Sequence, residues 1–464
     1  MAKELTPGEP DTETVLREAA QRSLRFLKGL RDRRVSPTPS EIQGADLLDG
    51  PVPDSGTDPA EVIRRLDEAG SPATIGSAGG RYFGFVIGGA GPAALAANWL
   101  AGAWNQNAGL FVTSPVAARL EEISLRWTRE LLGLPGGAEG GFVTGGTMAN
   151  FTALAAARHA VLSNVGWDVE ERGLIGAPPV TVILSEEAHT SVLKVLSMLG
   201  LGRGEVVRVP ADSQGRVKAD AFPDIAGPTI VCLQAGNVNS GAFDPIGEIA
   251  PPLRKSGAWV HVDGAFGMWA AVAPARRHLT EGIASADSWA TDGHKWLNVP
   301  YDSGIAFVRN PDHLRAAMSI GPAAYLIQSG HREPSHFTPE LSRRARGVEV
   351  WAAIRSLGRS GIGAIVERTC QFASHLADGL RAAGYDVLND VVLNQVLVSF
   401  GDDATTSGVV SGVQSDGTCW CGGTQWHGRS AMRISVSSWA TTADDVDRSL
   451  AAILRIAKEA RRAR

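Results

Sequence analysis

Cysteine and tyrosine are scarce in this chain, and it lacks several kinds of segment altogether. Four residues of each type occur among 464. The cysteines form no C-x-x-C pair, and the polar, charged start MAKELTPGEPDTETV does not resemble an export sequence. We therefore expect free thiols in a reducing cytoplasm. Cys419 and Cys421 could form half of a metal site, but no second pair answers them, so we expect no metal and leave the role of these thiols open.

Net charge is also small. The formal charge is −5 and the pI is near 6.1. Nothing in that balance favours a nucleic-acid or anionic-membrane partner. With 44% hydrophobic and 20% charged residues the composition is globular, and the length predicts two or three lobes rather than one core.

Charged residues are missing between Tyr82 and Ala118. A membrane-spanning helix needs about 20 mostly apolar residues. Here the apolar run is interrupted by Gly88, Gly89, Gly91, Pro92, Asn98, Asn105, Gln106 and Asn107. We expect a buried helix from Pro92 to about Trp104, and no membrane span.

The middle of the chain repeats a pattern of strand, loop and helix. Short apolar runs rich in β-branched residues occur at 179–184, 229–233, 258–262, 286–290 and 304–308. Helical stretches, including 148–163 and 190–199, lie between several of them. This alternation predicts a mainly parallel sheet with helices on both faces. Ligands of such sheets bind beyond the carboxyl ends of the strands.

Three parts of the chain can be expected. Residues 1–79 contain two predicted helices, at 11–33 and from Pro59 to about Ala69, and are too few to form a core, so they should pack on the rest of the protein or on a second subunit. Residues 80–340 carry the α/β pattern. Residues 341–464 predict a smaller α+β domain, with a long helix at about 347–382, a strand at 432–438 and a final amphipathic helix.

Two charged residues follow directly after predicted core strands. Asp263 ends the run HVD and could keep a heteroaromatic nitrogen protonated, although an Asp that caps the next turn explains it as well. Lys295 lies between His294 and Trp296, and a lysine removed from water can attack carbonyl groups. The alternative is a lysine whose amine extends to the surface.

Two further strand ends offer groups for a flat, phosphorylated ligand. Gly145, Gly146 and Thr147 lead into a helix, so backbone N–H groups and a hydroxyl could bind a phosphate, although many turns look alike. His189 follows 179–184 and could stack on a ring, although a single histidine is more often structural. Together, a phosphate site, a stacking ring, a carboxylate and a lysine suit a phosphorylated pyridine aldehyde, pyridoxal 5′-phosphate (PLP).

These segments, HVDGAFG, DGHKWL and GGTMAN, resemble those of the group II PLP-dependent amino acid decarboxylases, which include aromatic amino acid and glutamate decarboxylases. The resemblance covers about Tyr82 to Val446. It implies fold type I of the aspartate aminotransferase superfamily, with a mainly parallel seven-stranded sheet in the large domain and a smaller α+β C-terminal domain. It also implies site roles: Lys295 holds PLP as a Schiff base, Asp263 pairs with the pyridine nitrogen, His189 and Ala265 lie against the two ring faces, and Gly146, Thr147 and His294 contact the phosphate.

The resemblance further implies decarboxylation of an L-amino acid to the amine and CO₂. In the family a loop tyrosine returns a proton to Cα, and Tyr325 in GPAAYLIQSGHREPSH matches it. Family members that form aldehydes tend to carry Phe there, so Tyr325 favours simple decarboxylation. Aldehyde-forming decarboxylation, retro-aldol cleavage and transamination remain alternatives on the same scaffold. A PLP-fold protein without catalysis is a remote one.

Substrate and assembly are less constrained. The family has its active site at a dimer interface wrapped by N-terminal helices, so a homodimer is expected. Val238 replaces a polar family residue, and Gly80 and Arg81 replace His-Pro before Tyr82, which leaves substrate identity open. Aromatic residues that would suit an aromatic substrate, although core packing explains them equally well, are Phe83, Trp99, Trp104 and Phe111.

Overall fold

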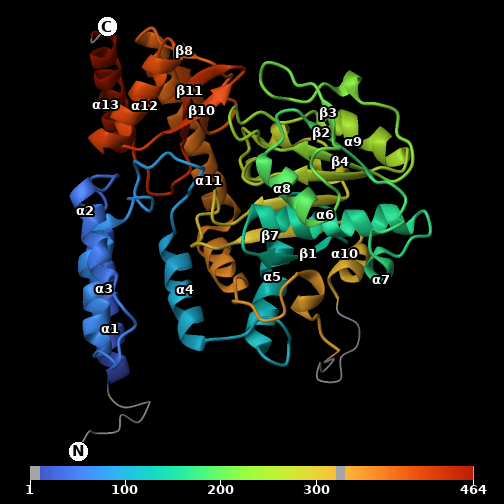
Figure 1. Ribbon diagram of the computed structural model, residues 1–464, viewed down its shortest axis with the longest axis horizontal. Helices are drawn as coiled ribbons and strands as arrows, with labels where there is room; N and C mark the ends of the chain where they lie inside the picture. Colours follow the sequence, from blue (N-terminus) through green and yellow to red (C-terminus); the bar gives the residue numbers. More distant parts are fainter. Residues whose placement is uncertain (1–10, 320–329, 463–464) are drawn as a thin grey trace, which may run out of the picture.

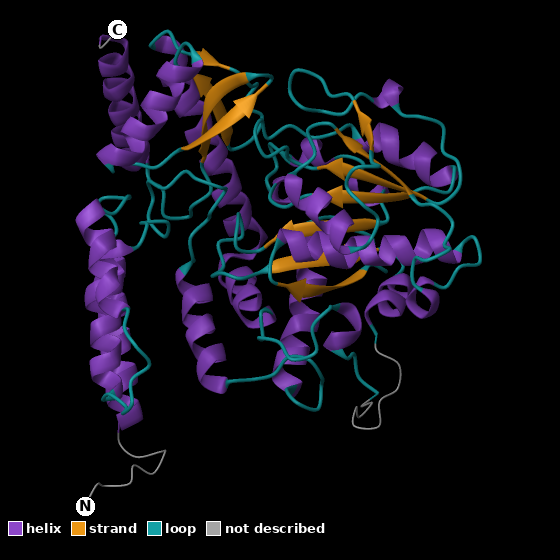
Figure 2. Ribbon diagram, in the orientation of Figure 1, coloured by secondary structure: helices purple, strands orange, loops and turns teal. Residues whose placement is uncertain are grey.

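The computed structural model describes residues 11–319 and 330–462, and its chain builds two sheets. The larger has seven strands in the order β1-β7-β6-β5-β4-β2-β3, and the smaller has four, β10-β11-β9-β8. Figure 1 places the smaller sheet beside the C-terminal helices and the larger one across the opposite half of the molecule. Helices cover both faces of the larger sheet, and the C-terminal helices pack beside the smaller one (Figure 2).

All strands of the large sheet except β7 run the same way. Parallel pairing joins β3, β2, β4, β5 and β6, and β7 is antiparallel to both β6 and β1. The strands are β1 (Glu139–Val143), β2 (Thr181–Ser185), β3 (Val207–Val209), β4 (Thr229–Gln234), β5 (Trp259–Asp263), β6 (Ser288–Asp292) and β7 (Gly304–Val308). The mainly parallel, fold-type I sheet expected from the sequence is confirmed.

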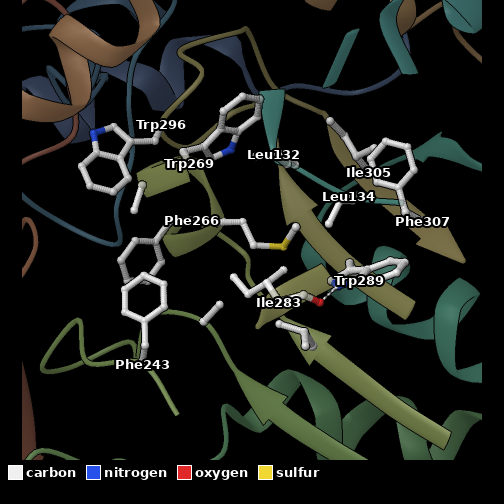
Figure 3. Packing of buried hydrophobic residues seen from close by; sticks show 14 of the residues in the cluster. Leu132, Leu134, Phe243, Phe266, Trp269, Ile283, Trp289, Trp296, Ile305 and Phe307 are labelled. Atoms are coloured by element: carbon white, nitrogen blue, oxygen red, sulfur yellow. Dashed lines mark hydrogen bonds between the residues drawn. The ribbon is translucent and has the colours of Figure 1, made fainter. Parts of the chain in front are cut away.

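Helices cover both faces of this sheet because successive strand residues point to opposite sides. Val182, Leu184 and Ile230 pack in a cluster with α6 and α8, whereas Ile183 and Val231 belong to the cluster with α5, α9 and α11. Figure 3 shows that second cluster, in which Trp269, Trp289 and Trp296 are fully buried. The helices of this half are α4 (Pro92–Trp104), α5 (Pro115–Leu131), α6 (Gly146–Ser163), α7 (Val169–Arg172), α8 (Thr190–Met198), α9 (Ile246–Lys255) and α10 (Pro311–Met318).

The smaller sheet has its own apolar core. Its elements are α11 (Gly347–Ala382), β8 (Asp386–Val387), β9 (Gln395–Ser399), α12 (Asp403–Asp416), β10 (Gly422–Trp426), β11 (Arg429–Ser435) and α13 (Ala443–Arg462). Residues 81–85 also join it, because Phe83 donates to the Trp420 carbonyl and accepts from the Ser435 N–H, and its ring is fully buried in this core.

The N-terminal helices α1 (Asp11–Gly29), α2 (Pro39–Gly44) and α3 (Pro59–Ala73) stand beside the body in Figure 1. Arg22 and Asp67 join α1 to α3 by an ion pair of 2.9 Å. Large apolar side chains of this part stay exposed, among them Leu16, Leu24, Ile42, Leu47, Val62 and Leu66.

All four cysteines are buried free thiols. Among residues 11–319 and 330–462, no helix has the length and apolarity that a bilayer crossing requires, and no group of three or more potential metal ligands gathers.

Candidate active site

A cavity of about 350 Å³ opens beyond the carboxyl ends of the parallel strands. Every predicted site residue that the structure describes lines it: Gly146, Thr147, His189, Asp263, Ala265, His294 and Lys295. Tyr325 lies outside the described residues. Larger cavities of about 580 and 540 Å³ lie elsewhere and contain none of these residues, so chemistry rather than size identifies the site.

One end of the cavity is the start of α6. Gly145 is the N-cap, and no side chain caps the helix, so its first N–H groups face the cavity without a side-chain acceptor. A Cβ on Gly146 would lie 2.9 Å from Asp292 Oδ2, which explains why this position has no side chain. Free N–H groups, the Thr147 hydroxyl and the positive helix end form an arrangement that binds phosphate.

His294 adds a directed donor at this end. Its Nδ1 accepts the Ser303 backbone N–H at 3.1 Å. Burial lowers the pKa of His294, and the charge of Asp292 opposes that effect. A neutral ring that accepts at Nδ1 carries its proton on Nε2, so Nε2–H is a donor.

Lys295 follows the end of β6, and its Nζ lies 3.0 Å from Asp292 Oδ2. The strand end is fixed from behind, because the buried Trp269 indole donates to the Asp292 carbonyl at 3.1 Å. The Lys295 side chain keeps 22% of its surface exposed. Its amine can therefore meet a ligand that enters the cavity, and the sequence-based alternative of an amine at the outer surface is excluded.

Asp263 ends the neighbouring strand β5 and is 7% exposed. Its Oδ1 accepts the Ala265 N–H at 3.2 Å, and its Oδ2 accepts from Asn150 Nδ2 at 3.0 Å. These two donors fix the direction of the carboxylate. Turn capping and a ligand-facing carboxylate, the two explanations left open by the sequence, are both present.

His189 also has a structural contact and faces the cavity. Its Nδ1 accepts the Ser191 N–H at 3.3 Å at the start of α8 and lies 2.7 Å from Ser191 Oγ. The ring is open to the cavity, yet surrounding protein atoms still lower the pKa of His189, and the Asp263 charge opposes this. A neutral imidazole held by its Nδ1 can lie flat against an aromatic ligand.

Three residues at or near the site were not singled out from the sequence. Asn150 lies one turn after Gly146 on α6, so helical spacing could have indicated it. Asp292 begins the DGHKWL segment, and no role for its carboxylate was expected from the sequence. Arg433 lies on β11, donates to the Val238 carbonyl at 3.2 Å, and is close enough for its charge to lower the pKa of His189. An arginine within an apolar strand was the available signal.

Aromatic side chains meet near Arg433, but they are not the ones expected. Tyr82 stacks on Trp420 with ring centroids 5.0 Å apart, and the Phe85 ring is 5.5 Å from the same indole. Burial raises the pKa of Tyr82 to about 12, and the Arg433 charge opposes that rise.

The expected aromatic residues lie elsewhere. Phe83 is in the core of the small sheet, Trp99 and Trp104 are 43% and 42% exposed on α4, and Phe111 stacks on His331. Arg81 also does not face the cavity, because its guanidinium donates to the Arg31 and Arg33 carbonyls.

The donor set fits PLP. The cavity offers phosphate donors at one end, a carboxylate for a protonated ring nitrogen, an imidazole for the ring and a lysine amine for the aldehyde. The uncapped start of α6, together with the Thr147 hydroxyl in the same cavity, favours a phosphorylated ligand.

Comparisons with known proteins agree. The model of the pyridoxal-dependent decarboxylase conserved domain matches residues 79–401. Aromatic-L-amino-acid decarboxylase of Bacillus atrophaeus is 28% identical over 381 residues, which cover 79% of this chain and 77% of that protein. Acidic amino acid decarboxylase GADL1 of Mus musculus is 31% identical over 314 residues, which cover 65% of this chain and 56% of that protein. Human cysteine sulfinic acid decarboxylase is 28% identical over 333 residues, covering 69% and 65%.

Solved structures show the same fold. A structure of Oryza sativa TDC with PLP and tryptamine has a TM-score of 0.90 and 22% identity, covering 98% of this chain and 99% of that one. Mouse CSAD has a TM-score of 0.89 and 22% identity, covering 97% and 99%. The chain therefore belongs to the pyridoxal-dependent decarboxylase family, with PLP as its cofactor and amino acid decarboxylation as its general reaction.

Proposed function

We propose that this enzyme decarboxylates an aromatic L-amino acid to the amine and CO₂, with Lys295 as the residue that binds the cofactor aldehyde. The observation that carries the proposal is the single cavity in which Lys295, Asp263, His189 and the start of α6 meet. Each group lies at the end of a different core element, so the fold holds the set rigidly.

The proposed cofactor contacts follow from the positions of these groups. Gly146, Thr147 and His294 Nε2–H bind the phosphate at the start of α6. Asp263 accepts the N–H of the pyridine nitrogen through an oxygen whose direction Asn150 and Ala265 fix. His189 and Ala265 lie against the ring.

Bound PLP supplies an electron sink for the pair that remains when the bond from Cα to the carboxylate breaks. Asp263 sustains that sink by keeping the ring nitrogen protonated. Cα then needs a proton, and we assign its delivery to the Tyr325 phenol. The Lys295 amine would bind the cofactor aldehyde again, which would free the product amine.

An aromatic substrate is supported by the stack of Tyr82, Trp420 and Phe85. Tyr82 lies near Arg433, whose charge also acts on His189, and the Arg433 guanidinium would provide positive charge for the α-carboxylate. Among the relatives, the Bacillus atrophaeus protein bears the name of an aromatic amino acid decarboxylase. Other relatives are named for acidic substrates, so the assay must include those.

We also propose that the chain has three parts, an N-terminal segment (1–79), a large PLP-binding domain (80–340) and a small C-terminal domain (341–464).

We further propose that the protein is a homodimer. Exposed apolar side chains of α1 to α3 have no core of their own, and Trp99, Leu100 and Trp104 add an exposed apolar strip on α4. Burying both sets against a second copy removes apolar surface from water. Free cysteines suit a reducing compartment, for which we propose the cytoplasm.

The deciding experiment incubates purified protein and PLP with a panel of aromatic, acidic and aliphatic L-amino acids. CO₂ and the organic product are measured together. Amine and CO₂ in equal amounts from aromatic substrates support the proposal. An aldehyde indicates oxidative decarboxylation instead, and turnover confined to glutamate, aspartate or cysteine sulfinate refutes the substrate class. A protein near twice the mass of 48.7 kDa in solution supports the dimer.

A further inference from the structure

A row of buried polar side chains runs behind the cavity to Asp263. Trp259, His261 and Asp263 alternate along β5 and so share its face toward α6. Trp259 Nε1 donates to Ser288 Oγ at 2.8 Å, and Ser288 Oγ lies 2.9 Å from His261 Nδ1. His261 Nε2 lies 2.9 Å from Asn150 Oδ1, and Asn150 Nδ2 donates to Asp263 Oδ2 at 3.0 Å. The three middle residues are at most 1% exposed.

The chemistry at both ends fixes the direction of this row. An indole N–H can only donate, and an ionised carboxylate can only accept. Asn150 must therefore turn its amide N–H toward Asp263 and its oxygen toward His261. That oxygen requires a proton on His261 Nε2, which leaves Nδ1 to accept the Ser288 hydroxyl. Every hydrogen bond then points toward Asp263, and such aligned bonds strengthen one another.

This arrangement requires a neutral His261. Burial lowers the pKa of His261 to about 4, with Asp263 opposing that effect. The ring is therefore neutral near pH 7 and has one N–H and one acceptor nitrogen, as the row requires.

We propose that Asn150 and His261 are positioning residues, and that this directed row of hydrogen bonds sets the orientation of the Asp263 carboxylate toward the ring nitrogen of the cofactor. The proposal rests on the proposed role of Asp263. Asn150 acts on the carboxylate directly, and His261 acts through Asn150. Ser288 and Trp259 select the tautomer of His261.

The same row joins the two ends of the cofactor site. Gly146 and Thr147 begin α6, and Asn150 lies one helical turn later on the same helix, so its side chain is on the same face. The bond from Asn150 to Asp263 therefore ties α6 to β5. This bond thereby sets the distance between the phosphate donors and the Asp263 carboxylate. The two groups must bind opposite ends of the same rigid ligand.

The alternative is that these hydrogen bonds only pair buried polar groups in the core and have no effect on cofactor binding. A ligand pair separates the two explanations: PLP, and its analogue in which C–H replaces the ring nitrogen. Only PLP can use the Asp263 carboxylate. We would measure dissociation constants of both ligands by equilibrium dialysis for wild type, Asn150→Leu, His261→Leu and His261→Gln. Asn394→Leu is the matched control, since Asn394 is equally buried and donates to the Val436 carbonyl in the small sheet.

Asn150→Leu removes a hydrogen bond to a charged group and should weaken PLP binding about 10- to 100-fold, with little change for the analogue. His261→Leu should have the same selectivity with a smaller effect, because His261 acts through Asn150. His261→Gln should keep most of the affinity, because its side-chain amide can replace the Nε2–H donor. Equal weakening of both ligands, or of neither, would overturn the inference. Asn394→Leu should leave the preference for PLP unchanged.

Two further measurements keep these outcomes separate from failure of the proposed function or of folding. Wild type must show the absorbance of a Schiff base between PLP and a lysine, and Lys295→Ala must lack it. If wild type lacks this absorbance, the proposed cofactor role is refuted instead. If the leucine variants do not fold, His261→Gln and Trp259→Phe decide. Trp259→Phe keeps a ring and removes the first donor, so it should lower the preference for PLP, and an unchanged preference in a folded protein refutes the row.

Discussion

Lys295 and Asp292 form an ion pair of 3.0 Å at the end of β6, although the amine has to react with an aldehyde. Asp292 also lies against the start of α6, where a Cβ on Gly146 would be 2.9 Å from its Oδ2. The carboxylate thus fixes the lysine, and it also opposes the arrival of a phosphate at the same helix end. Cofactor uptake must rearrange this pair.

Asp292→Asn should accelerate covalent uptake of PLP. The amide keeps the shape of the side chain but removes the charge that holds the ammonium and repels phosphate. Stopped-flow absorbance should show a faster rate and the same final signal as wild type. Lys295→Ala should give no covalent signal and a turnover lower by at least about 10³-fold. A slower rate in Asp292→Asn would mean that the carboxylate assists uptake.

Gly146→Ala should weaken PLP binding without unfolding the protein. Its methyl group would crowd Asp292 and occupy the phosphate end of the cavity, and overpacking of this kind costs about 1–3 kcal/mol. Gly137→Ala is the control, because a Cβ there meets nothing within 4 Å. Dialysis with PLP and thermal unfolding of the apo protein measure the two effects. Equal affinity in both variants would place the phosphate elsewhere.

Strong local patterns made much of the fold predictable. The predicted helix from Pro92 to Trp104 has the predicted bounds, since Pro92 is at its first turn and Asn105 ends it in the left-handed conformation. Strand β1 is not among the apolar runs that predicted strands, because its sequence EGGFV has no run of β-branched residues. Its glycines are needed for packing: a Cβ on Gly140 would lie 1.8 Å from the Ala306 carbonyl oxygen. Close packing between distant strands cannot be seen in a local pattern.

Site residues could be predicted from the sequence where a single chemically active residue directly follows a predicted strand. Lys295, Asp263 and His189 each follow an apolar run directly, so position alone indicated them. Arg433 could not be predicted in this way, because it lies on β11 of the small sheet and comes close to His189 only through the packing of that sheet beside the large one.

Of the aromatic residues in the uncharged stretch, Phe83 packs in the small-sheet core, as the alternative of core packing allowed, and Trp99 and Trp104 are exposed on α4. Composition alone does not say which face of α4 is covered.

Tyr325→Phe should reduce amine formation and leave PLP binding intact. Without a phenolic proton donor, return of the proton to Cα slows, and general acid catalysis of this kind is worth about 10²–10⁴-fold. Gas and product analysis should be combined, because CO₂ release without matching amine would reveal diversion to aldehyde. Tyr385→Phe is the control, as Tyr385 is buried in the small-sheet core. Unchanged amine formation would assign the proton to another donor.

Arg433→Gln should raise KM for the amino acid far more than it changes inhibition by the product amine. The amine lacks the carboxylate that the guanidinium is proposed to bind, so its inhibition constant should not change when the guanidinium is removed. Removal of a hydrogen bond to a charged group costs about 1.5–3 kcal/mol. Steady-state kinetics with the amine as competitor gives both constants. Equal weakening of the substrate and the amine would mean that Arg433 shapes the pocket through its contact with the Val238 carbonyl.

His261 should make the protein sensitive to mild acid. Burial lowers the pKa of His261 to about 4, whereas histidine in an unfolded chain titrates near about 6.5. Between these values the unfolded chain binds a proton that the folded chain does not. The free energy of unfolding therefore falls as pH drops, by about 3 kcal/mol in total from this group.

His261→Gln removes that titration and keeps the donor toward Asn150. The variant should be less stable than wild type near neutral pH, because the fit to Ser288 is lost, but its stability should fall less between pH values of about 6.5 and 4. Urea unfolding of both apo proteins across this range measures the difference. If the two stability curves run parallel, His261 takes up a proton in the folded state, and the row of hydrogen bonds to Asp263 cannot have the direction assigned to it.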